Sequence, residues 1–135
     1  VGTSAAVLSE LVKRLIEHLG QWCIEKVILS KQPDFIEKNQ IILDADKVGN
    51  IVLRYWKAGD RFSPRGINGS KKLARVMRDL HISADERRIW PLVADENHIY
   101  WIAFLRGSNY GLPDKNTKKY LLITLKKENR EDEES

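Results

Sequence analysis

The chain has 135 residues, 42% of them hydrophobic and 31% charged, which suits one domain with its own core and a charged surface. No apolar run approaches the roughly 18 residues needed to span a bilayer, and charges interrupt the first residues too often for a signal peptide. The net charge of +4 is unevenly distributed, because residues 54–78 carry a net +7 and residues 128–135 a net −4.

The N-terminal residues are predicted to form an amphipathic helix from Ala5 to Leu19, because apolar residues recur there at spacings of three and four. Gly20 is expected to end this helix. The next stretch, WCIEKVILS, is short and rich in β-branched residues, so it fits either a strand or a continuation of the helix. A break is expected over residues 30–35.

The rest of the chain is predicted to consist mostly of short strands. Ser70 is the expected N-cap of one internal helix, whose apolar residues lie at i, i+3, i+4 and i+7. The last strand is apolar on both faces and is expected to be largely buried. In chain order we expect strands over 41–43 and 51–56 joined by a turn near Gly49, an ordered loop over 57–70, a helix over 71–81 and a helical turn over 85–88. Three strands follow, over 90–94, 98–105 and 118–126. Residues 95–97 are expected to join the strands over 90–94 and 98–105 as a hairpin.

These elements indicate an α+β fold: a small, mostly antiparallel β module with one internal basic helix, preceded by the N-terminal amphipathic helix. The expected organisation is a helical segment over 1–36, as the end of a preceding domain or a linker, a folded domain over 37–127, and an acidic tail over 128–135. The tail lacks apolar anchors and is expected to be disordered.

The stretch that bears most on function is WKAGDRFSPRGINGSKK, residues 56–72, where cations gather at a bend. Gly66 and Gly69 allow left-handed backbone angles there at little cost. Lys71 and Lys72 are expected on the first turn of the helix, where the positive end of the helix dipole disfavours a cation by about 0.3–1 kcal/mol. Unpaired amides and two ammonium groups at that position favour the binding of an anion instead.

The number of cations indicates a polyanion rather than a small anion. Phosphates recur along nucleic acid, and release of their counterions favours binding to clustered lysine and arginine. A solvated basic face without a partner is the alternative interpretation. The candidate binding residues are Arg54, Lys57, Arg61, Arg65, Lys71, Lys72, Arg75 and Arg78.

Other kinds of site find little support in the sequence. The two glycines are too closely spaced for a nucleotide-binding P-loop, and Ser70 precedes the lysines rather than following them. The histidines lie on separate segments, and no serine has a visible base, so we predict no catalytic residue and no metal ligand. The single cysteine, Cys23, is interpreted as a small buried residue of a reduced, cytoplasmic protein. Tryptophans 56, 90 and 101 are expected in the core, with base stacking as the alternative.

The stretch LRYWKAGDRFSPRGINGSKKL resembles the C-terminal domain of the tRNA(Ile)-lysidine synthetase family. The family pattern runs R-x-W-K-x-G-D-R, then P-x-G-x-x-G, then a pair of lysines that opens a helix. The matching positions are Arg54, Trp56, Lys57, Gly59, Asp60, Arg61, Pro64, Gly66, Gly69, Lys71 and Lys72.

The similarity continues through ARVMRDLHI, ERRIWPLV and IYWIAFLR and covers roughly residues 41–125. Two positions depart from the pattern. Ser83 stands where the family often has proline, and Phe104 stands where a glycine usually precedes the final Leu-Arg. These departures concern local loop shape only.

The resemblance implies a role within a larger ligase that modifies tRNA. In that family the full enzyme uses ATP to activate the wobble cytidine of an isoleucine tRNA, and lysine then attacks to form lysidine. Catalysis, with ATP and magnesium, belongs to an N-terminal domain with an S-G-G-x-D-S phosphate loop. That loop is absent from this sequence, so the chain is expected to be the non-catalytic C-terminal part, without a cofactor of its own.

The same resemblance implies the partners. The family's C-terminal region helps to grip the tRNA on its acceptor-stem side, so residues 37–127 are expected to be an RNA-binding domain that works beside the catalytic domain in the cytoplasm, without a membrane. The fold is expected to resemble a β-rich module of the phenylalanyl-tRNA synthetase β subunit. The alternative is a protein-interaction or intramolecular docking module with an incidental basic face, whose N-terminal helix forms a homodimer or packs on a neighbouring domain.

Overall fold

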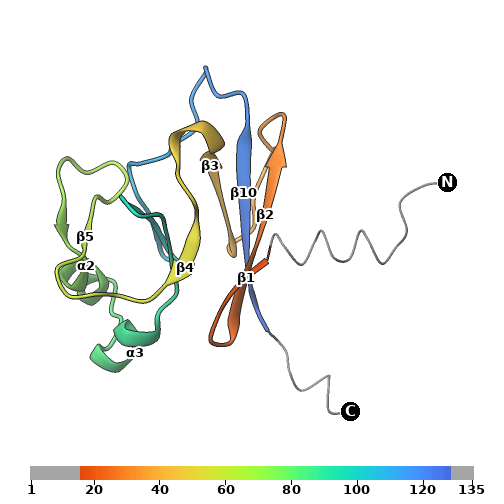
Figure 1. The fold of residues 1–135 in the computed structure, drawn as a ribbon. Coiled ribbons are helices and arrows are strands. Elements are labelled where there is room, and N and C mark those ends of the chain that lie inside the picture. The colour runs from red at the N-terminus through yellow and green to blue at the C-terminus, as the bar shows by residue number, and fades with distance from the viewer. Residues whose placement is uncertain (1–15, 129–135) are drawn as a thin grey trace, which may run out of the picture.

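The computed structural model describes residues 16–128 and shows two four-stranded antiparallel sheets facing each other, with short helices beside the second sheet (Figure 1). The first sheet has the order β1 (Ile16–Leu19), β2 (Trp22–Leu29), β10 (Tyr120–Lys127), β3 (Gln40–Asp44). The second has the order β4 (Val52–Arg54), β7 (Leu92–Ala94), β8 (Ile99–Ile102), β9 (Arg106–Gly107). The remaining elements are a 3-10 turn, η1 (Ala45–Lys47), a two-stranded ladder of β5 (Arg61–Phe62) and β6 (Lys71–Lys72), and the helices α2 (Leu73–Asp79) and α3 (Ala84–Ile89).

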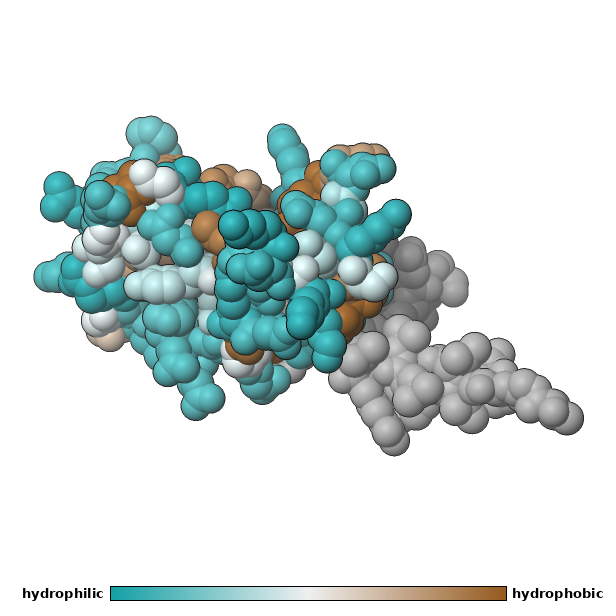
Figure 2. Space-filling view, turned by 90° about the horizontal axis from the view of Figure 1, so that it is seen from above, coloured by the Kyte–Doolittle hydropathy of each residue, from teal (hydrophilic) through white to brown (hydrophobic). Residues whose placement is uncertain are grey.

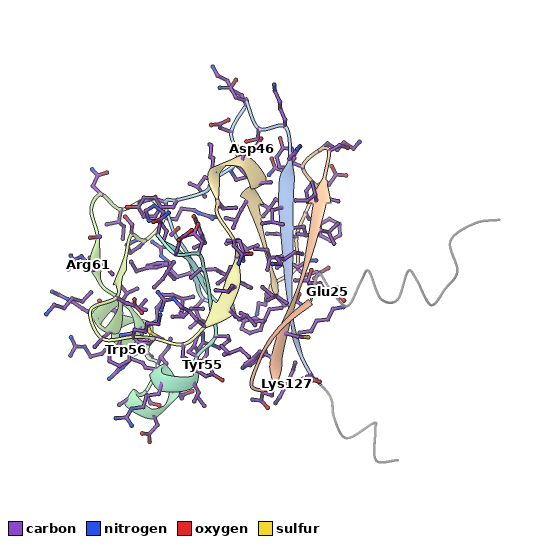
Figure 3. The ribbon with its side chains drawn as sticks, in the orientation of Figure 1. Glu25, Asp46, Tyr55, Trp56, Arg61 and Lys127 are labelled. Carbon is purple, nitrogen blue, oxygen red and sulfur yellow. The ribbon has the colours of Figure 1, made fainter. Side chains whose placement is uncertain are left out.

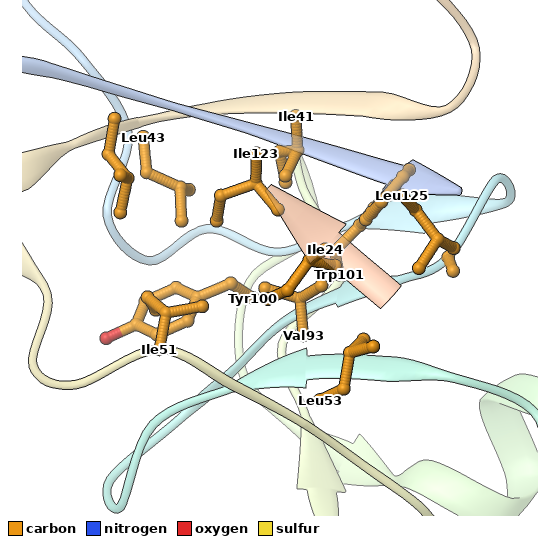
Figure 4. Packing of buried hydrophobic residues seen from close by; sticks show 12 residues of the cluster. Ile24, Ile41, Leu43, Ile51, Leu53, Val93, Tyr100, Trp101, Ile123 and Leu125 are labelled. Atoms are coloured by element: carbon orange, nitrogen blue, oxygen red, sulfur yellow. The ribbon is translucent and has the colours of Figure 1, made fainter. Parts of the chain in front are cut away.

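The core consists of two clusters, one on each face of the second sheet. The larger cluster fills the space between the two sheets (Figure 4) and includes Ile24, Ile41, Leu43, Ile51, Leu53, Val93, Tyr100, Trp101, Ile123 and Leu125. The smaller cluster lies between the second sheet and α2 and includes Phe62, Leu73, Val76, Met77, Leu92, Ile99 and Ile102. The face shown in Figure 2 is largely hydrophilic, with hydrophobic residues scattered over it.

The expected α+β class and most of the expected strands are confirmed. The strands predicted over 41–43, 51–56, 90–94, 98–105 and 118–126 correspond to β3, β4, β7, β8 and β10, with shifts at their ends. β7 and β8 form the predicted hairpin, in which the carboxylate of Asp95 accepts hydrogen bonds from the amides of Asn97 and His98, both at 2.8 Å. β3 and β4, however, belong to different sheets, because η1 carries the chain from one sheet to the other.

The prediction of an N-terminal helix is wrong at its C-terminal end, because residues 16–19 form β1. β1 pairs with β2 across a tight turn in which Gly20 has φ +60°, so Gly20 ends a strand rather than a helix. β2 pairs along its whole length with β10, which explains why WCIEKVILS is a strand. The first sheet therefore crosses the expected boundary between residues 36 and 37.

The remainder of the predicted helix, residues 5–15, and nearly all of the predicted acidic tail lie outside the described residues. Within residues 16–128, no helix is long and apolar enough to cross a membrane. Trp101 is buried, and Trp56 and Trp90 are half-buried against the smaller core cluster, as the core interpretation predicted.

Candidate nucleic-acid interface

The glycine-containing loop between β4 and α2 is held in shape by its own ladder and by a buried aromatic ring. Arg61 is opposite Lys72 and Phe62 is opposite Lys71, while the Phe62 side chain is buried beside α2. Gly66 and Gly69 have φ of +83° and +82°, in the left-handed region that glycine adopts without strain, as the sequence predicted.

The tip of this loop is clamped by Asn109, a residue more than 40 positions away in the sequence. The Asn109 side-chain amide donates hydrogen bonds to the carbonyl oxygens of Pro64 and Ile67, at 2.9 and 2.8 Å. Its side-chain oxygen accepts a hydrogen bond from the Gly66 amide at 2.9 Å. All of the polar groups of the Asn109 side chain are thus used to order the bend, and no local sequence signal identifies this role.

The predicted start of the basic helix is wrong. Lys71 and Lys72 lie in β6, and α2 begins only at Leu73, whose amide donates to the Asp60 carbonyl at 2.8 Å. Ser70 does not cap α2, and its hydroxyl instead accepts a hydrogen bond from Arg61 Nε at 2.9 Å. Because Lys71 and Lys72 are extended and paired with β5, they do not lie on the first turn of α2, so the expected arrangement of two lysines on a first turn capped by Ser70 is not found.

The same lysines nevertheless contribute to one shallow, solvent-open groove of about 560 Å³ beside α2. Among the described residues, no carboxylate lines this groove. Its charged lining consists of Arg61, Lys71, Lys72, Arg75, Arg78 and Arg87, and we call it the cationic groove. Figure 3 shows Arg61 on the α2 side of the molecule, far from Lys127 on the first sheet.

One edge of the cationic groove is held in place by backbone and hydroxyl oxygens. Arg61 donates from Nε to the Ser70 hydroxyl and from Nη2 to the Ser70 carbonyl oxygen, each at 2.9 Å. Because neither acceptor is a carboxylate, the positive charge of Arg61 is oriented but not neutralised.

Three of the eight predicted binding residues lie outside the groove. Arg54 is paired with Asp60. Burial alone would raise the pKa of Asp60, but the hydrogen bonds from Arg54 and from the Lys57 amide outweigh burial and lower the pKa. Lys57 is exposed and lies with Arg54 at a separate depression that also contains acids.

Arg65 points the other way, over Gly107, and donates from Nε to the Ser108 carbonyl oxygen at 3.4 Å. Burial, and then the positive charge of Arg106, lower the pKa of the Arg65 guanidinium. The eight candidates therefore do not act as one set: Arg61, Lys71, Lys72, Arg75 and Arg78 come together and the other three do not.

Arg87 was missed by the sequence interpretation, although a local signal for its helix was available. Ser83 caps α3 in a reciprocal capping box with Glu86, in the position where the family often has proline. α3 packs beside α2, and Arg87 donates from Nη1 to the Ile82 carbonyl oxygen at 3.1 Å while its side chain lines the groove.

Two other kinds of site, a metal centre and a reactive cysteine, find no support among the described residues. Between residues 16 and 128, no three histidine, cysteine, aspartate or glutamate side chains are placed to hold a metal ion. Cys23 is half-buried, and its burial, followed by the charges of Glu128 and Glu25, raises the pKa of its thiol. A raised pKa disfavours the reactive thiolate.

A family model described as the TilS substrate C-terminal domain matches residues 51–123 of the chain, which hold the glycine-containing loop, α2 and α3. The chain belongs to this family. The resemblance seen in the sequence is therefore confirmed, and the matched span contains every residue of the cationic groove.

Curated relatives of this TilS C-terminal domain extend well beyond it. The tRNA(Ile)-lysidine synthase of Caldanaerobacter subterraneus subsp. tengcongensis is 40% identical over 115 residues, which are 84% of this chain and 25% of that protein. The tRNA(Ile)-lysidine synthase of Clostridium acetobutylicum is 40% identical over 92 residues, 67% of this chain and 20% of that protein. The chain thus spans between a fifth and a quarter of the length of these relatives.

Two solved structures resemble the TilS C-terminal domain described above. A crystal structure of a TilS C-terminal domain superposes with a TM-score of 0.72 at 24% identity, covering 84% of this chain and 91% of that one. An N-terminal fragment of the phenylalanyl-tRNA synthetase β subunit from Pyrococcus horikoshii superposes with a TM-score of 0.52 at 15% identity, covering 89% of this chain and 31% of that one. The expected likeness to the synthetase module is confirmed at the level of the fold.

Proposed function

We propose that this domain binds tRNA through the cationic groove and so serves as the non-catalytic, substrate-gripping part of a tRNA(Ile)-lysidine synthase. The observation that carries the proposal is the convergence of six basic side chains from β5, β6, α2 and α3 on one groove that no carboxylate of the described residues lines. The names of the curated relatives supply the identity of the polyanion.

The groove suits a phosphate backbone better than a single small anion. Its cations stand on four structural elements, β5, β6, α2 and α3, and are exposed, apart from the half-buried Arg87. A-form RNA is recognised largely through its shape, phosphates and 2′-hydroxyl groups, which needs charge in the right places rather than contacts to base edges. We expect the groove to contribute affinity and placement on the acceptor-stem side of the tRNA, without reading its sequence.

The chemistry belongs, in this proposal, to the part of the longer protein that the chain does not include. There, ATP and magnesium activate the wobble cytidine of an isoleucine tRNA, and lysine is joined to it. The parent protein is thus proposed to be a cytoplasmic ligase. This domain is proposed to hold the acceptor-stem side of the tRNA, away from the wobble cytidine.

The proposal is tested by measuring tRNA affinity across a range of salt concentrations. If the groove neutralises roughly four to six phosphates, log Kd should rise with log salt with a slope of about 4 to 5. The double variant Lys71→Ala/Lys72→Ala should weaken binding at least about ten-fold and lower the slope by about 2. Binding without salt dependence, or no tRNA binding at any salt concentration, contradicts the proposal.

A matched control separates the groove from net charge. Lys118 and Lys119 are exposed just before β10 and do not line the groove, so Lys118→Ala/Lys119→Ala removes the same charge elsewhere. We expect this control to leave the slope nearly unchanged. Equal losses in the two double variants would instead assign binding to a diffuse basic surface.

A second function, docking of this domain onto the rest of the longer protein, is favoured by one specific surface. An apolar depression of about 380 Å³ lies between the β1–β2 turn, α3 and the end of β8. It is lined mostly by aromatic and apolar side chains, including Ile89, which is 62% exposed. The lining residues are Gln21, Trp22, Tyr55, Glu86, Ile89, Trp90, Pro91 and Phe104.

Hydrogen exchange distinguishes docking from an uncovered surface. The amides of α3 should exchange more slowly in the full-length parent protein than in this chain alone, because the partner domain would cover the depression. Ile89→Asp in the parent should restore fast exchange without affecting the cationic groove. Equal exchange rates in the two proteins contradict docking at this surface.

A further inference from the structure

A second, polar pocket of about 340 Å³ adjoins the cationic groove, and the two share Arg61 and Ser70 in their lining. The pocket differs from the groove in its charges. Asp60, Asp95 and Glu96 contribute to its walls, whereas no carboxylate of the described residues lines the groove. A ligand that passes from the groove over Arg61 therefore leaves a purely cationic surface and meets hydrogen-bond acceptors.

An aromatic stack forms part of the same pocket. The rings of His98 and Tyr110 lie parallel, with centroids 3.8 Å apart and planes at 14°. His98 also meets the buried Tyr100 ring edge-on, at 6.1 Å. Although His98 covers one face of Tyr110, 40% of Tyr110 remains exposed.

The backbone amide of each of these two residues is anchored by a hydrogen bond. The His98 amide donates to the carboxylate of Asp95 at 2.8 Å, and the Tyr110 amide donates to the Ser108 hydroxyl at 3.1 Å. Ser108 is fully buried. The stack thus stands on backbone anchored at both residues and forms an aromatic surface beside a polar pocket, which is the arrangement that holds an unpaired base in single-strand-binding proteins.

The charges of the pocket argue against a phosphate and for a neutral ring with polar edges. Asp60 is paired with Arg54, and Asp95 accepts hydrogen bonds from Tyr100 and from nearby amides, so both acids stay ionised within the pocket wall. Negative charge repels phosphate, which stays in the cationic groove. The oxygens of Asp60 and Asp95 are occupied by these bonds, so the polar edge of a base would meet the exposed side chains of Glu96 and Asn97, which together offer a hydrogen-bond donor and acceptors.

We propose that this pocket takes one unpaired nucleobase of the RNA held in the cationic groove, stacked on Tyr110, with His98 as its backing. This inference rests on the proposed RNA-binding function and adds a preference for RNA with an unpaired nucleotide next to the bound duplex. The ligand class is a nucleobase of any identity, because stacking depends on a π face that every base has.

The test uses the whole chain and two RNA duplexes of the same sequence, one blunt and one with a short single-stranded end, prepared in both polarities. We expect the chain to bind one of the overhang duplexes at least about five-fold more tightly than the blunt duplex. Tyr110→Ala and Tyr110→Leu should remove this advantage, and Tyr110→Phe should keep it. None of the three should change the affinity for the blunt duplex or the salt slope.

The outcomes separate the two proposals. An overhang advantage that survives Tyr110→Leu, or the absence of any advantage in the unmodified chain, overturns the nucleobase pocket while leaving the groove in place. Failure to bind either duplex overturns the proposed function itself. Lys71→Ala/Lys72→Ala serves as the matched control, because it should weaken binding of both duplexes by the same factor and so preserve their ratio. Circular dichroism confirms that each Tyr110 variant is folded.

Discussion

The guanidinium of Arg54 faces the carboxylate of Asp60 as a two-point pair, with Nη1–Oδ2 at 2.8 Å and Nη2–Oδ1 at 3.1 Å. Asp60 also accepts the Lys57 amide at 2.8 Å, and its carbonyl oxygen accepts the Leu73 amide. The pair therefore ties β4 to Asp60 and, through the Asp60 carbonyl oxygen, to the start of α2. Arg54 belongs to the family pattern and is predicted from the sequence to bind phosphate, but in the structure it shapes the loop through Asp60.

This pairing predicts that Arg54→Ala affects stability more than RNA binding. Loss of the guanidinium leaves the partly buried Asp60 without its charged donor, which should reduce the free energy of unfolding by about 1–3 kcal/mol. Urea denaturation measures this change. The salt slope for tRNA should stay within experimental error of the unmodified chain, and a slope lowered by about 1 would show that Arg54 contacts phosphate after all.

Arg87 should behave in the opposite way. Arg87→Ala is expected to weaken tRNA binding by roughly five- to ten-fold and to lower the salt slope by about 1, because one cation of the groove is lost. The neighbouring Arg88 is exposed on α3 but does not line the groove, so Arg88→Ala is the matched control. Fluorescence anisotropy with labelled tRNA measures both variants. Equal effects would mean that α3 faces the RNA differently from the proposed arrangement.

Phe104 stores backbone strain at a position where the family usually has glycine. Its φ is +68°, in the left-handed region that costs a residue with a side chain about 1–2 kcal/mol, while its ring lies 5.7 Å from that of Trp22 and 5.9 Å from that of Trp101. Phe104→Ala loses the ring contacts and keeps the strain, whereas Phe104→Gly loses both.

We therefore expect the glycine variant to be more stable than the alanine variant by about 1 kcal/mol, although glycine is ordinarily the more flexible residue. Thermal and urea unfolding of the two variants provide the comparison. An alanine variant as stable as the glycine variant would show that the backbone at 104 relaxes once the ring is removed.

Asp95 predicts a loss of stability in acid. Burial alone would raise its pKa, but hydrogen bonds from the Tyr100 hydroxyl and from the amides of Gly49, His98 and Asn97 outweigh burial and lower the pKa to about 2. Because the folded pKa is below the usual value of 3.8, the stabilisation is complete above about pH 4 and is lost as the pH falls toward 2.

The size of this contribution is about 2 kcal/mol at neutral pH. In Asp95→Asn, the free energy of unfolding should be lower at pH 7 and should fall less steeply between pH 4 and pH 2.5 than in the unmodified chain. Asp60 and Asp114, whose pKa values are also lowered, should maintain part of the acid sensitivity in the variant. Parallel pH profiles in the two proteins would show that Asp95 does not titrate as described.

Five of the ten strands that the structure describes were predicted, because their signals are local. The hairpin around 95–97 depends on residues close in sequence and is found in the structure. The apolar run of β10 is also local and marks a strand, but only Leu121, Ile123 and Leu125 are buried, so the expectation that this strand is largely buried is not met. β1 was mistaken for the end of a helix because Ile16 and Leu19 are three residues apart, which continues the helical period, and only pairing with β2, itself paired to β10 about 100 residues later, selects the strand. Lys71 and Lys72 were misplaced for the same reason, since their partners belong to β5.

The sequence by itself determined that cations gather around a glycine bend and that the chain carries the motif of its family. Which cations share one surface was decided only by the tertiary structure. Arg54 and Arg65 count as positive charges in any sequence tally, yet one is neutralised by Asp60 and the other lies over Gly107. Arg87 joins the groove only because α3 packs beside α2. Composition sets how much charge is present, but the direction of each side chain depends on hydrogen-bond partners that the fold positions, some near in sequence, as Asp60 is to Arg54, and some distant, as Ser108 is from Arg65.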